Sequence, residues 1–145
     1  SDSGFVFFTN YESYKGKQLA ENPKACLVIF WKELERQVRI TGLVEKVSAK
    51  ESDEYFHSRP VGSQLGAVTS PQSTIIENRE WLENKYQDLE KKMEGHAIDR
   101  PDHWGGYLVK PVLIEFWQGR PSRLHDRLEY SIQEGGGWRI ERLAP

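Results

Sequence analysis

The sequence is poor in the features that mark several common classes of protein. Its 145 residues include one cysteine, Cys26, so an internal disulfide is impossible. Because Cys26 lies in an apolar run, we expect a buried thiol in a strand. No apolar run approaches the roughly 20 residues of a membrane span, and residues 1–4 lack the basic and apolar parts of a signal peptide. We therefore expect no membrane partner and a cytoplasmic location, with an organelle not excluded.

An excess of one charge is also missing, and so are the common cofactor motifs. Twenty basic and 22 acidic residues give a formal net charge of −2, which provides no general attraction to nucleic acid. The glycine patterns of dinucleotide and P-loop sites, the HExxH motif and paired CxxC motifs are absent. The histidines at positions 57, 96, 103 and 125 lack metal-ligand spacing, so we expect no metal site. Any anion site must come from local clusters of cations.

The chain does have the composition of one folded domain. Its residues are 37% hydrophobic and 12% aromatic, which is enough for a core of ordinary size in a domain spanning residues 1–145. Short runs rich in β-formers predict strands. The predicted strands cover residues 5–9, 25–31, 37–47, 104–109, 112–118, 127–132 and 138–143, with a hairpin turn at the glycines 135–137.

Capping residues predict helices between some of these strands. Ser13 begins one helix, and Ser48 with Glu51 has the spacing of a capping box for a second, which Pro60 ends. A polar, glycine-rich loop is expected beyond Pro60, followed by an amphipathic helix over residues 77–93. Strands that follow one another without regular crossover helices favour an antiparallel barrel or sandwich with peripheral helices.

The strand predicted over residues 37–47 has two different faces. Ile40 and its apolar neighbours lie on one face, while Gln37 and Arg39 lie on the other. We therefore expect the face that carries Gln37 and Arg39 to be exposed to solvent or to bind a ligand. Gly42 in the same run favours a bulge.

Cations gather beside an aromatic residue in the last third of the chain. Read as a strand, Arg123, His125 and Arg127 point to one face, near the flat ring of Trp117. A basic, hydrogen-bonding strip beside an aromatic face suits a planar, phosphorylated ligand. The competing interpretation is that these arginines are surface charges and that Trp117 packs in the core.

These residues belong to a longer series of motifs that resembles the pyridoxamine 5′-phosphate oxidase family over nearly the whole chain. The resemblance implies an FMN-binding split barrel, antiparallel and Greek-key-like, and a homodimer with FMN at the interface. It also implies oxidation of pyridoxamine or pyridoxine 5′-phosphate to pyridoxal 5′-phosphate, with hydride passing to the flavin and electrons then to oxygen, giving hydrogen peroxide. The motifs are FFTN (7–10), ERQV (35–38), YFHSRP (55–60), SQLGA (63–67), QS (72–73), WGG (104–106), EFWQG (115–119), RLHDR (123–127) and RLAP (142–145).

The resemblance also implies which residues form the site. Arg123 and His125 would be the catalytic residues, holding the pyridine ring and the reacting carbon, and His125 could move a proton near neutral pH. The residues implied for the substrate phosphate are Tyr55, Arg59 and Ser63. The residues implied for FMN are Phe8, Thr9, Lys15, Gln37, Gln72, Ser73, Trp117 and Arg127.

Two departures from the family pattern qualify these expectations. The family usually has an arginine beside the lysine of the FMN phosphate site, and Tyr14 stands there in this chain. Family members also begin with two further strands that carry an RxVLLK-like segment, which is missing before Ser1. We therefore expect a truncated chain whose single domain is incomplete at the amino end.

Three functions remain open from the sequence. The first is the FMN-dependent oxidase of vitamin B6 phosphates, with oxygen as the acceptor. The second is a related flavin oxidase of another aromatic ring, such as one in phenazine synthesis. The third is a catalytically impaired module that binds a vitamin B6 phosphate or forms a dimer. In the third alternative the flavin is lost through Tyr14 and the missing strands, so this protein would be colourless, whereas the first two would be yellow with bound FMN.

Overall fold

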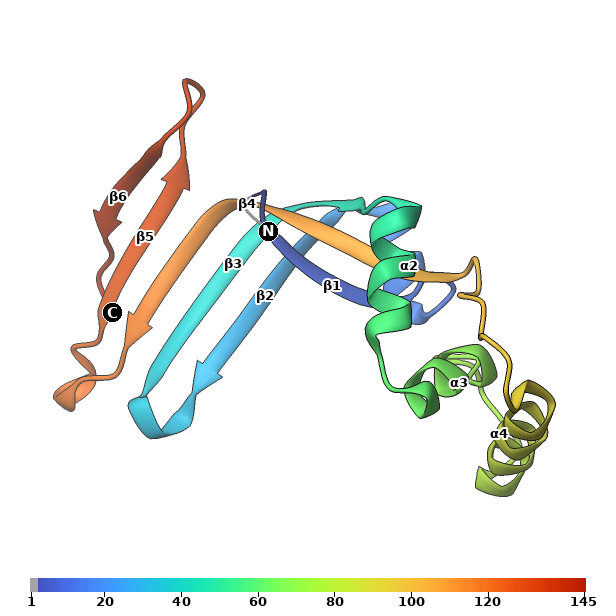
Figure 1. Ribbon diagram of the computed structural model, residues 1–145. Helices are drawn as coiled ribbons and strands as arrows, with labels where there is room; N and C mark the ends of the chain where they lie inside the picture. The colour runs from blue at the N-terminus through green and yellow to red at the C-terminus, as the bar shows by residue number, and fades with distance from the viewer. Residues whose placement is uncertain (1–2) are drawn as a thin grey trace. The chain divides into compact units, whose positions relative to one another are not determined.

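The computed structural model describes residues 3–145 and divides them into two compact units, each described here by itself. The sheet unit contains residues 3–5, 23–45 and 108–145, and the helix unit contains residues 6–22 and 46–107. The elements along the chain are β1 (Phe5–Asn10), α1 (Tyr14–Glu21), β2 (Lys24–Trp31), η1 (Lys32–Leu34), β3 (Arg36–Lys46), α2 (Ala49–Ser58), α3 (Val61–Thr69), α4 (Arg79–Met93), β4 (Trp104–Gln118), η2 (Pro121–Arg123), β5 (Asp126–Ile132) and β6 (Trp138–Arg142) (Figure 1).

The sheet places its strands in the order β2-β3-β4-β5-β6, and β1 pairs with β4. The pairs β2–β3, β4–β5 and β5–β6 are antiparallel. A mainly β fold with flanking helices is thereby confirmed. Gly42 makes no bulge against β2, because the register between β2 and β3 is regular through Ala25 and Gly42. Glycine is needed there because a Cβ would collide with the carbonyl oxygen of Lys110.

The predicted hairpin at the three glycines is confirmed. The backbone N–H of Gln133 donates to the carbonyl of Gly137 at 3.2 Å, and β5 pairs with β6 on either side of the turn. Gly136 and Gly137 have φ angles of +82° and +81°, a region that side chains with a Cβ seldom enter. The glycines therefore set the position of this turn.

One strand replaces the two that were expected over residues 104–109 and 112–118. β4 runs without a break through Pro111. Proline fixes φ near an extended value, and the residue before it also favours extended backbone. Pro111 therefore removes one ladder donor without ending the strand.

The helix unit has an aromatic and aliphatic core. Phe56, Leu65, Ile98 and Trp104 are buried together, and side chains of α4 pack against them. The predicted helix over residues 77–93 is confirmed with a slightly later start. Its first turn is capped by Asn78, whose side-chain oxygen accepts from the Trp81 N–H at 2.8 Å.

The loop expected beyond Pro60 is wrong, because α3 begins there. Pro60 lies at the N-cap with φ −53°, a value compatible with a helix start. The helix turns Gln64, Leu65 and Thr69 inward, where all are buried. Burial of this face outweighs the low helix propensity of the two glycines in α3.

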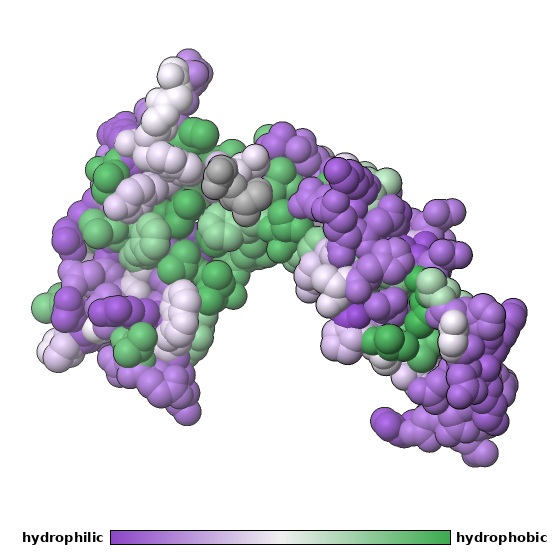
Figure 2. All heavy atoms as spheres, viewed as in Figure 1, coloured by the Kyte–Doolittle hydropathy of each residue, from purple (hydrophilic) through white to green (hydrophobic). Residues whose placement is uncertain are grey.

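The expectation that Cys26 is buried is also wrong, since its side chain is exposed. β2 lies at the edge of the sheet and carries apolar residues on both faces. Val28 and Phe30 are 57% and 56% exposed, and hydrophobic side chains reach the surface over the sheet unit (Figure 2). The apolar run around Cys26 therefore predicted the strand correctly but not the burial of its side chains. No helix among residues 3–145 is both long and apolar enough to cross a membrane.

Candidate functional site

The sheet unit brings an aromatic ring and two titratable side chains to one face. Trp117 of β4 lies directly opposite Arg127 of β5, so both side chains share a face of the sheet. The ring of His125 packs on Trp117, with centroids 4.9 Å apart and planes 46° apart. Gln37 comes from β3, the strand on the other side of β4. The expected grouping of Trp117, His125 and Arg127 is thus present.

Arg123 does not join this group through a strand. It ends η2 with a φ of +61°, and its neighbour Ser122 has a φ of +59°. The interpretation of residues 123–127 as one strand is therefore wrong, because Pro121 starts a tight turn before β5. Arg123 is exposed and makes no hydrogen bond or ion pair within the described part of the chain. Its guanidinium is available for a ligand.

Arg127 is held by a buried carboxylate. Its Nε donates to Glu115 Oε1 at 2.8 Å and its Nη2 donates to Glu115 Oε2 at 3.2 Å. The Glu115 side chain is 5% exposed, and Arg39 Nη2 also donates to it, at 2.6 Å. The hydrogen bond from Arg127, aided by the charge of Arg39, lowers the pKa of Glu115, although burial acts in the opposite direction. This carboxylate is therefore ionised at neutral pH.

The backbone fixes the orientation of His125. Its Nδ1 accepts a hydrogen bond from the Arg120 N–H at 3.1 Å. In neutral imidazole the proton then lies on Nε2, which is free to donate to a ligand. The next residue, Asp126, binds the side chains of Arg120 and Arg142. Hydrogen bonds from Arg120 and then Arg142 lower the pKa of Asp126.

The helix unit stacks three aromatic rings and one guanidinium. Phe8 of β1 lies on Tyr55 of α2 with centroids 3.7 Å apart, and Tyr55 is parallel to Trp104 within 2°. The guanidinium of Arg59 lies 4.9 Å from the Trp104 ring. Its Nη1 is buried and has no hydrogen-bond acceptor within the described residues. A buried cationic donor without an acceptor has the chemistry to bind an anion.

Ser63 lies in the first turn of α3, four residues after Arg59. The hydroxyls of Ser63 and Tyr55 make no hydrogen bond within residues 3–145, so both can donate to a ligand. Gln64, which the sequence did not suggest, is buried, and its Nε2 donates to the Arg59 carbonyl at 2.8 Å. It therefore fixes the backbone that carries the cation.

A second polar group gathers at the end of β1. Gln72 Oε1 accepts from the Thr9 hydroxyl at 3.5 Å and from the Asn10 N–H at 3.1 Å, which leaves its amide N–H groups for a ligand. Ser73 follows with a φ of +67°. Lys15 lies in the first turn of α1, with its Nζ 5.4 Å from a phenyl ring of β1.

The expected site residues therefore divide between the two units. Phe8, Thr9, Lys15, Tyr55, Arg59, Ser63, Gln72 and Ser73 belong to the helix unit, and Gln37, Trp117, Arg123, His125 and Arg127 belong to the sheet unit. Phe8 contacts Tyr55 and Thr9 contacts Gln72 in the helix unit, and Trp117 contacts His125 in the sheet unit. Their assignment to FMN and substrate stays a prediction.

Glu115 and Arg39 lie beside this set but were given no role in the site from the sequence. The period of two placed Arg39 on the face of Gln37 in β3, and it could also have placed Glu115 on the face of Trp117 in β4. The pattern could not show that β3 and β5 flank β4. Only that arrangement brings both cations to one carboxylate.

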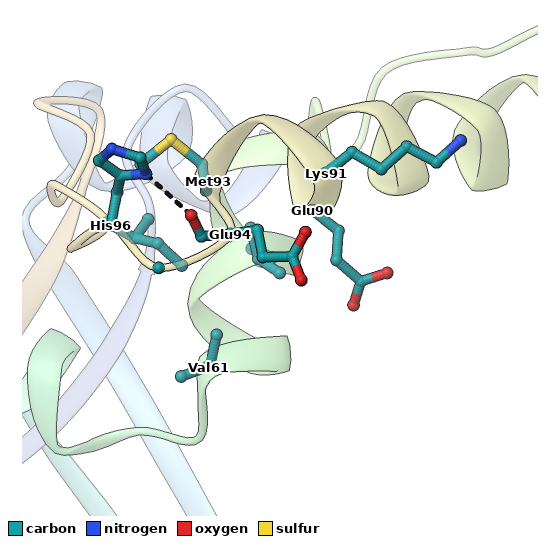
Figure 3. A pocket seen from close by; sticks show the side chains of 9 residues that line it. Val61, Glu90, Lys91, Met93, Glu94 and His96 are labelled. Carbon is teal, nitrogen blue, oxygen red and sulfur yellow. Dashed lines mark hydrogen bonds between the residues drawn. The ribbon is translucent and has the colours of Figure 1, made fainter.

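Each unit has a cleft. In the sheet unit a cleft of about 400 Å³ is lined mainly by side chains on the face opposite Arg127, such as Phe116 and Leu128, and Gln37 and Trp117 also border it. In the helix unit a cleft of about 630 Å³ lies between α3 and the end of α4 (Figure 3). Val61 and Met93 line it, and the His96 ring contacts the Glu94 carbonyl at 2.9 Å. No cluster of three metal-ligating side chains occurs in the described range 3–145.

Two family models match the chain in succession. The one described as pyridoxamine 5′-phosphate oxidase matches residues 1–92. The one described as the pyridoxine 5′-phosphate oxidase C-terminal dimerisation region matches residues 104–145. Together they cover both parts of the chain that carry the site residues.

Curated relatives match nearly the whole chain. The pyridoxine/pyridoxamine 5′-phosphate oxidase of Polynucleobacter asymbioticus is 59% identical over 143 residues, covering 99% of this chain and 67% of the relative. The chloroplastic pyridoxine/pyridoxamine 5′-phosphate oxidase 1 of Arabidopsis thaliana is 54% identical over 148 residues, covering 99% of this chain and 28% of the relative. The chain thus spans about two thirds of the bacterial relative's length.

Solved structures share the fold. PhzG from Burkholderia lata 383, in complex with tetrahydrophenazine-1-carboxylic acid, has a TM-score of 0.93 and is 31% identical, covering 100% of this chain and 70% of its own. A pyridoxamine 5′-phosphate oxidase-related, FMN binding protein from Nostoc punctiforme has a TM-score of 0.73 at 17% identity, covering 97% and 71%, and shows the fold alone. The expected split-barrel fold is confirmed.

Proposed function

The chain belongs to the pyridoxamine 5′-phosphate oxidase family, and we propose that it binds FMN and oxidises pyridoxamine or pyridoxine 5′-phosphate to pyridoxal 5′-phosphate. Oxygen is the acceptor. For the amine substrate, water and oxygen are consumed and ammonia and hydrogen peroxide are released together with the aldehyde. The alcohol substrate gives the same aldehyde and hydrogen peroxide without water or ammonia.

Each unit by itself contains residues whose chemistry suits part of FMN. In the helix unit Lys15 supplies a cation for a phosphate, and the free amide of Gln72 supplies donors for polar edges of a flavin. In the sheet unit Trp117 offers a flat apolar ring, and Arg127 retains N–H groups that Glu115 does not occupy. FMN supplies the two-electron redox chemistry when bound. The protein's own groups bind and orient the reactants.

One observation carries the substrate assignment: the buried Nη1 of Arg59 has no acceptor within the described residues. Leaving a charged donor buried without a hydrogen-bond partner costs more than leaving a neutral one, so a ligand anion at Nη1 would be stabilising. The free hydroxyls of Tyr55 and Ser63 come from the same pair of helices. A dianionic phosphate satisfies all three groups at once.

Arg123 and His125 have the chemistry to orient the rest of the substrate. Arg123 is exposed and without a partner among residues 3–145, so its planar guanidinium can bind a ring oxygen or nitrogen. His125 presents Nε2, because its Nδ1 already accepts from the backbone. A neutral imidazole held in this way can donate a hydrogen bond from Nε2 to a ligand.

The test is the visible spectrum of the purified chain with added FMN, followed by anaerobic addition of pyridoxamine 5′-phosphate. Bleaching of bound flavin is expected. Flavin that binds and stays oxidised, under conditions in which a full-length relative is bleached, would overturn the proposed reaction.

Arg59→Met provides the matched variant for the phosphate assignment. It removes the charge and keeps an apolar stem for packing on Trp104. We expect bleaching by pyridoxamine 5′-phosphate to need at least about tenfold more substrate, by the usual strength of a charge-assisted bond. Bleaching by pyridoxamine, which lacks the phosphate, should not change between wild type and Arg59→Met. Exposed Arg79, replaced by methionine, is the control.

A second candidate function is favoured by the likeness to PhzG, whose structure holds a tetrahydrophenazine carboxylic acid. That ligand has a carboxylate and a fused ring in place of a phosphate and a pyridine. Anaerobic addition of tetrahydrophenazine-1-carboxylic acid to the FMN-loaded chain separates the two. Faster bleaching by this compound than by pyridoxamine 5′-phosphate would favour the phenazine function.

We also propose a homodimer. The match of residues 104–145 to a dimerisation region supports it. Sedimentation equilibrium of the chain, with and without FMN, should give twice the monomer mass of 16.9 kDa. A monomer at concentrations at which a full-length relative is dimeric would contradict this assignment.

A further inference from the structure

We propose that Glu115 is a positioning residue that sets the guanidinium of Arg127 for ligand binding, with Arg39 as its second support. The inference deepens the proposed function, on which it rests for the identity of the ligand. It concerns a residue that belongs to the EFWQG motif but was given no role in the site. Its basis is a ladder of side chains across three adjacent strands of the sheet unit.

The ladder runs from β3 through β4 to β5, which are neighbours in the sheet. Arg39 of β3 donates from Nη2 to Glu115 Oε2 at 2.6 Å. Arg127 of β5 donates from Nε to Oε1 at 2.8 Å and from Nη2 to Oε2 at 3.2 Å. Two hydrogen bonds from one guanidinium to one carboxylate fix the plane of the guanidinium as well as its position.

A third contact holds Arg127 from the other end. Its Nη1 donates to the carbonyl of Ala144 at 2.9 Å, and the backbone N–H of Leu143 donates to the Arg127 carbonyl at 3.0 Å. A guanidinium has five N–H groups, of which Glu115 takes two and Ala144 takes one. One N–H therefore remains on each of Nη1 and Nη2. These two donors have a fixed direction before any ligand arrives.

Burial makes Glu115 suited to this role. Its side chain is 5% exposed, whereas those of Arg127 and Arg39 are 28% and 43% exposed. A carboxylate in that position stays charged only because both cations face it, and it cannot leave them without losing every partner. Arg127 keeps an accessible side on the face that it shares with Trp117. The carboxylate of Glu115 is thus buried, while the guanidinium of Arg127 that it holds remains partly exposed.

Glu129 is an alternative partner for Arg127, and the contact with Glu115 prevents Arg127 from turning toward it. Glu129 lies opposite Glu115 in the β4–β5 register, and its charge acts on Arg127. Without the bidentate contact to Glu115, the guanidinium is free to turn toward Glu129. The direction of the remaining donors would then be lost while the charge near Trp117 would be retained. Glu115 therefore contributes orientation rather than charge.

The first test needs no cofactor. In the side-chain ¹⁵N spectrum of the chain without FMN, the Nε–H signal of Arg127 is identified by its loss in Arg127→Lys. We expect its exchange with solvent to become about tenfold faster in Glu115→Gln, as a charge-assisted contact is replaced by a neutral one. Glu45→Gln is the control, since it removes an exposed carboxylate of the same unit that binds Lys110 at 2.7 Å. An unchanged exchange rate in Glu115→Gln overturns the inference.

The second test is a double-mutant cycle on FMN affinity, measured by quenching of flavin fluorescence. Glu115→Gln should weaken FMN binding about tenfold in the wild-type background. If Glu115 acts through Arg127, the same change should have no further effect in the Arg127→Lys background. Equal weakening in both backgrounds would mean that Glu115 has a merely structural role, and the inference would fail.

Two further measurements distinguish a failure of the inference from misfolding of a variant and from a failure of the proposed function. Thermal unfolding shows whether each variant is folded. If Glu115→Gln is not folded, Glu115→Asp takes its place, because it keeps the charge on a shorter side chain. Failure of the wild-type chain to bind FMN would count against the proposed function. In that case the exchange rate of the Arg127 Nε–H still decides whether Glu115 positions Arg127.

Discussion

The rings of Phe8 and Tyr55 lie face to face, with centroids 3.7 Å apart and planes 12° apart. Tyr55 is 44% exposed, and its hydroxyl makes no hydrogen bond within the described residues. Packing and ligand binding therefore use different parts of one side chain. They can be separated by substitution.

Tyr55→Phe keeps the stacked ring and removes the hydroxyl. We expect the Kd for pyridoxal 5′-phosphate to rise about tenfold, with thermal stability unchanged within error. Tyr55→Leu also removes the aromatic pair with Phe8 and should lower the free energy of unfolding by about 1 kcal/mol more. Ligand titration by absorbance and urea unfolding measure the two effects. Equal ligand affinity in Tyr55→Phe would remove the hydroxyl from the phosphate site.

Tyr14→Arg should tighten FMN binding. Tyr14 is 71% exposed at the first position of α1, beside Lys15, so an arginine fits there without repacking. A second cation for the flavin phosphate should lower the Kd about tenfold at low salt, and the gain should shrink at high salt. Tyr14→Gln, a polar variant without the charge, is the control. Equal tightening by the glutamine variant would exclude an electrostatic cause.

Arg123→Ala should lower kcat/KM about a hundredfold, because a group that orients the substrate is lost. The free energy of unfolding should stay within about 0.5 kcal/mol, since Arg123 is exposed and has no partner in the described part of the chain. Arg123→Gly should raise it by about 0.5 to 1 kcal/mol, as the φ of +61° suits glycine. Steady-state kinetics and urea unfolding test both statements. A large loss of stability in Arg123→Ala would contradict the exposed position of this side chain.

The contribution of Glu115 to stability should disappear in acid. Its pKa is lowered in the folded state, chiefly by the hydrogen bond from Arg127, so the unfolded chain binds the proton more readily. The stabilisation is fully present above the unfolded glutamate pKa of about 4.3 and is lost as the pH falls through the lower folded pKa. At pH 7 Glu115→Gln should be less stable than wild type by about 1 to 2 kcal/mol.

Below about pH 4 that difference should shrink, by the same linkage. Urea unfolding of both proteins between pH 3 and pH 7 measures it, with Glu45→Gln as the exposed control. A difference that stays constant over this range would mean that the charge of Glu115 does not stabilise the fold.

Local signals in the sequence predicted much of the fold. Ser13 and Ser48 cap the helices that were expected from them, because a cap needs only the few residues that follow it. The glycine turn before β6 was found for the same reason. The helix α3 was missed, since its stability comes from burying residues such as Leu65 in a core that local sequence does not show.

The site was predictable only as a set of residues. The strand pattern correctly gave His125 and Arg127 a common face with Trp117. It placed Arg123 there too, because alternation cannot detect a turn with positive φ angles. The ladder through Glu115 depends on which strands are neighbours, and that information lies in long-range pairing.

The edge position of β2 has a consequence for the exchange of its backbone amides with deuterium. Among the described residues β2 pairs only with β3, so alternate N–H groups from Lys24 to Trp31 have no acceptor in the sheet. Every second amide of β2 should therefore exchange within seconds, and those between should be protected. Any strand or partner that covers this edge would slow the fast set alone. The exchange rates of these alternate amides therefore show whether the free edge of β2 is paired.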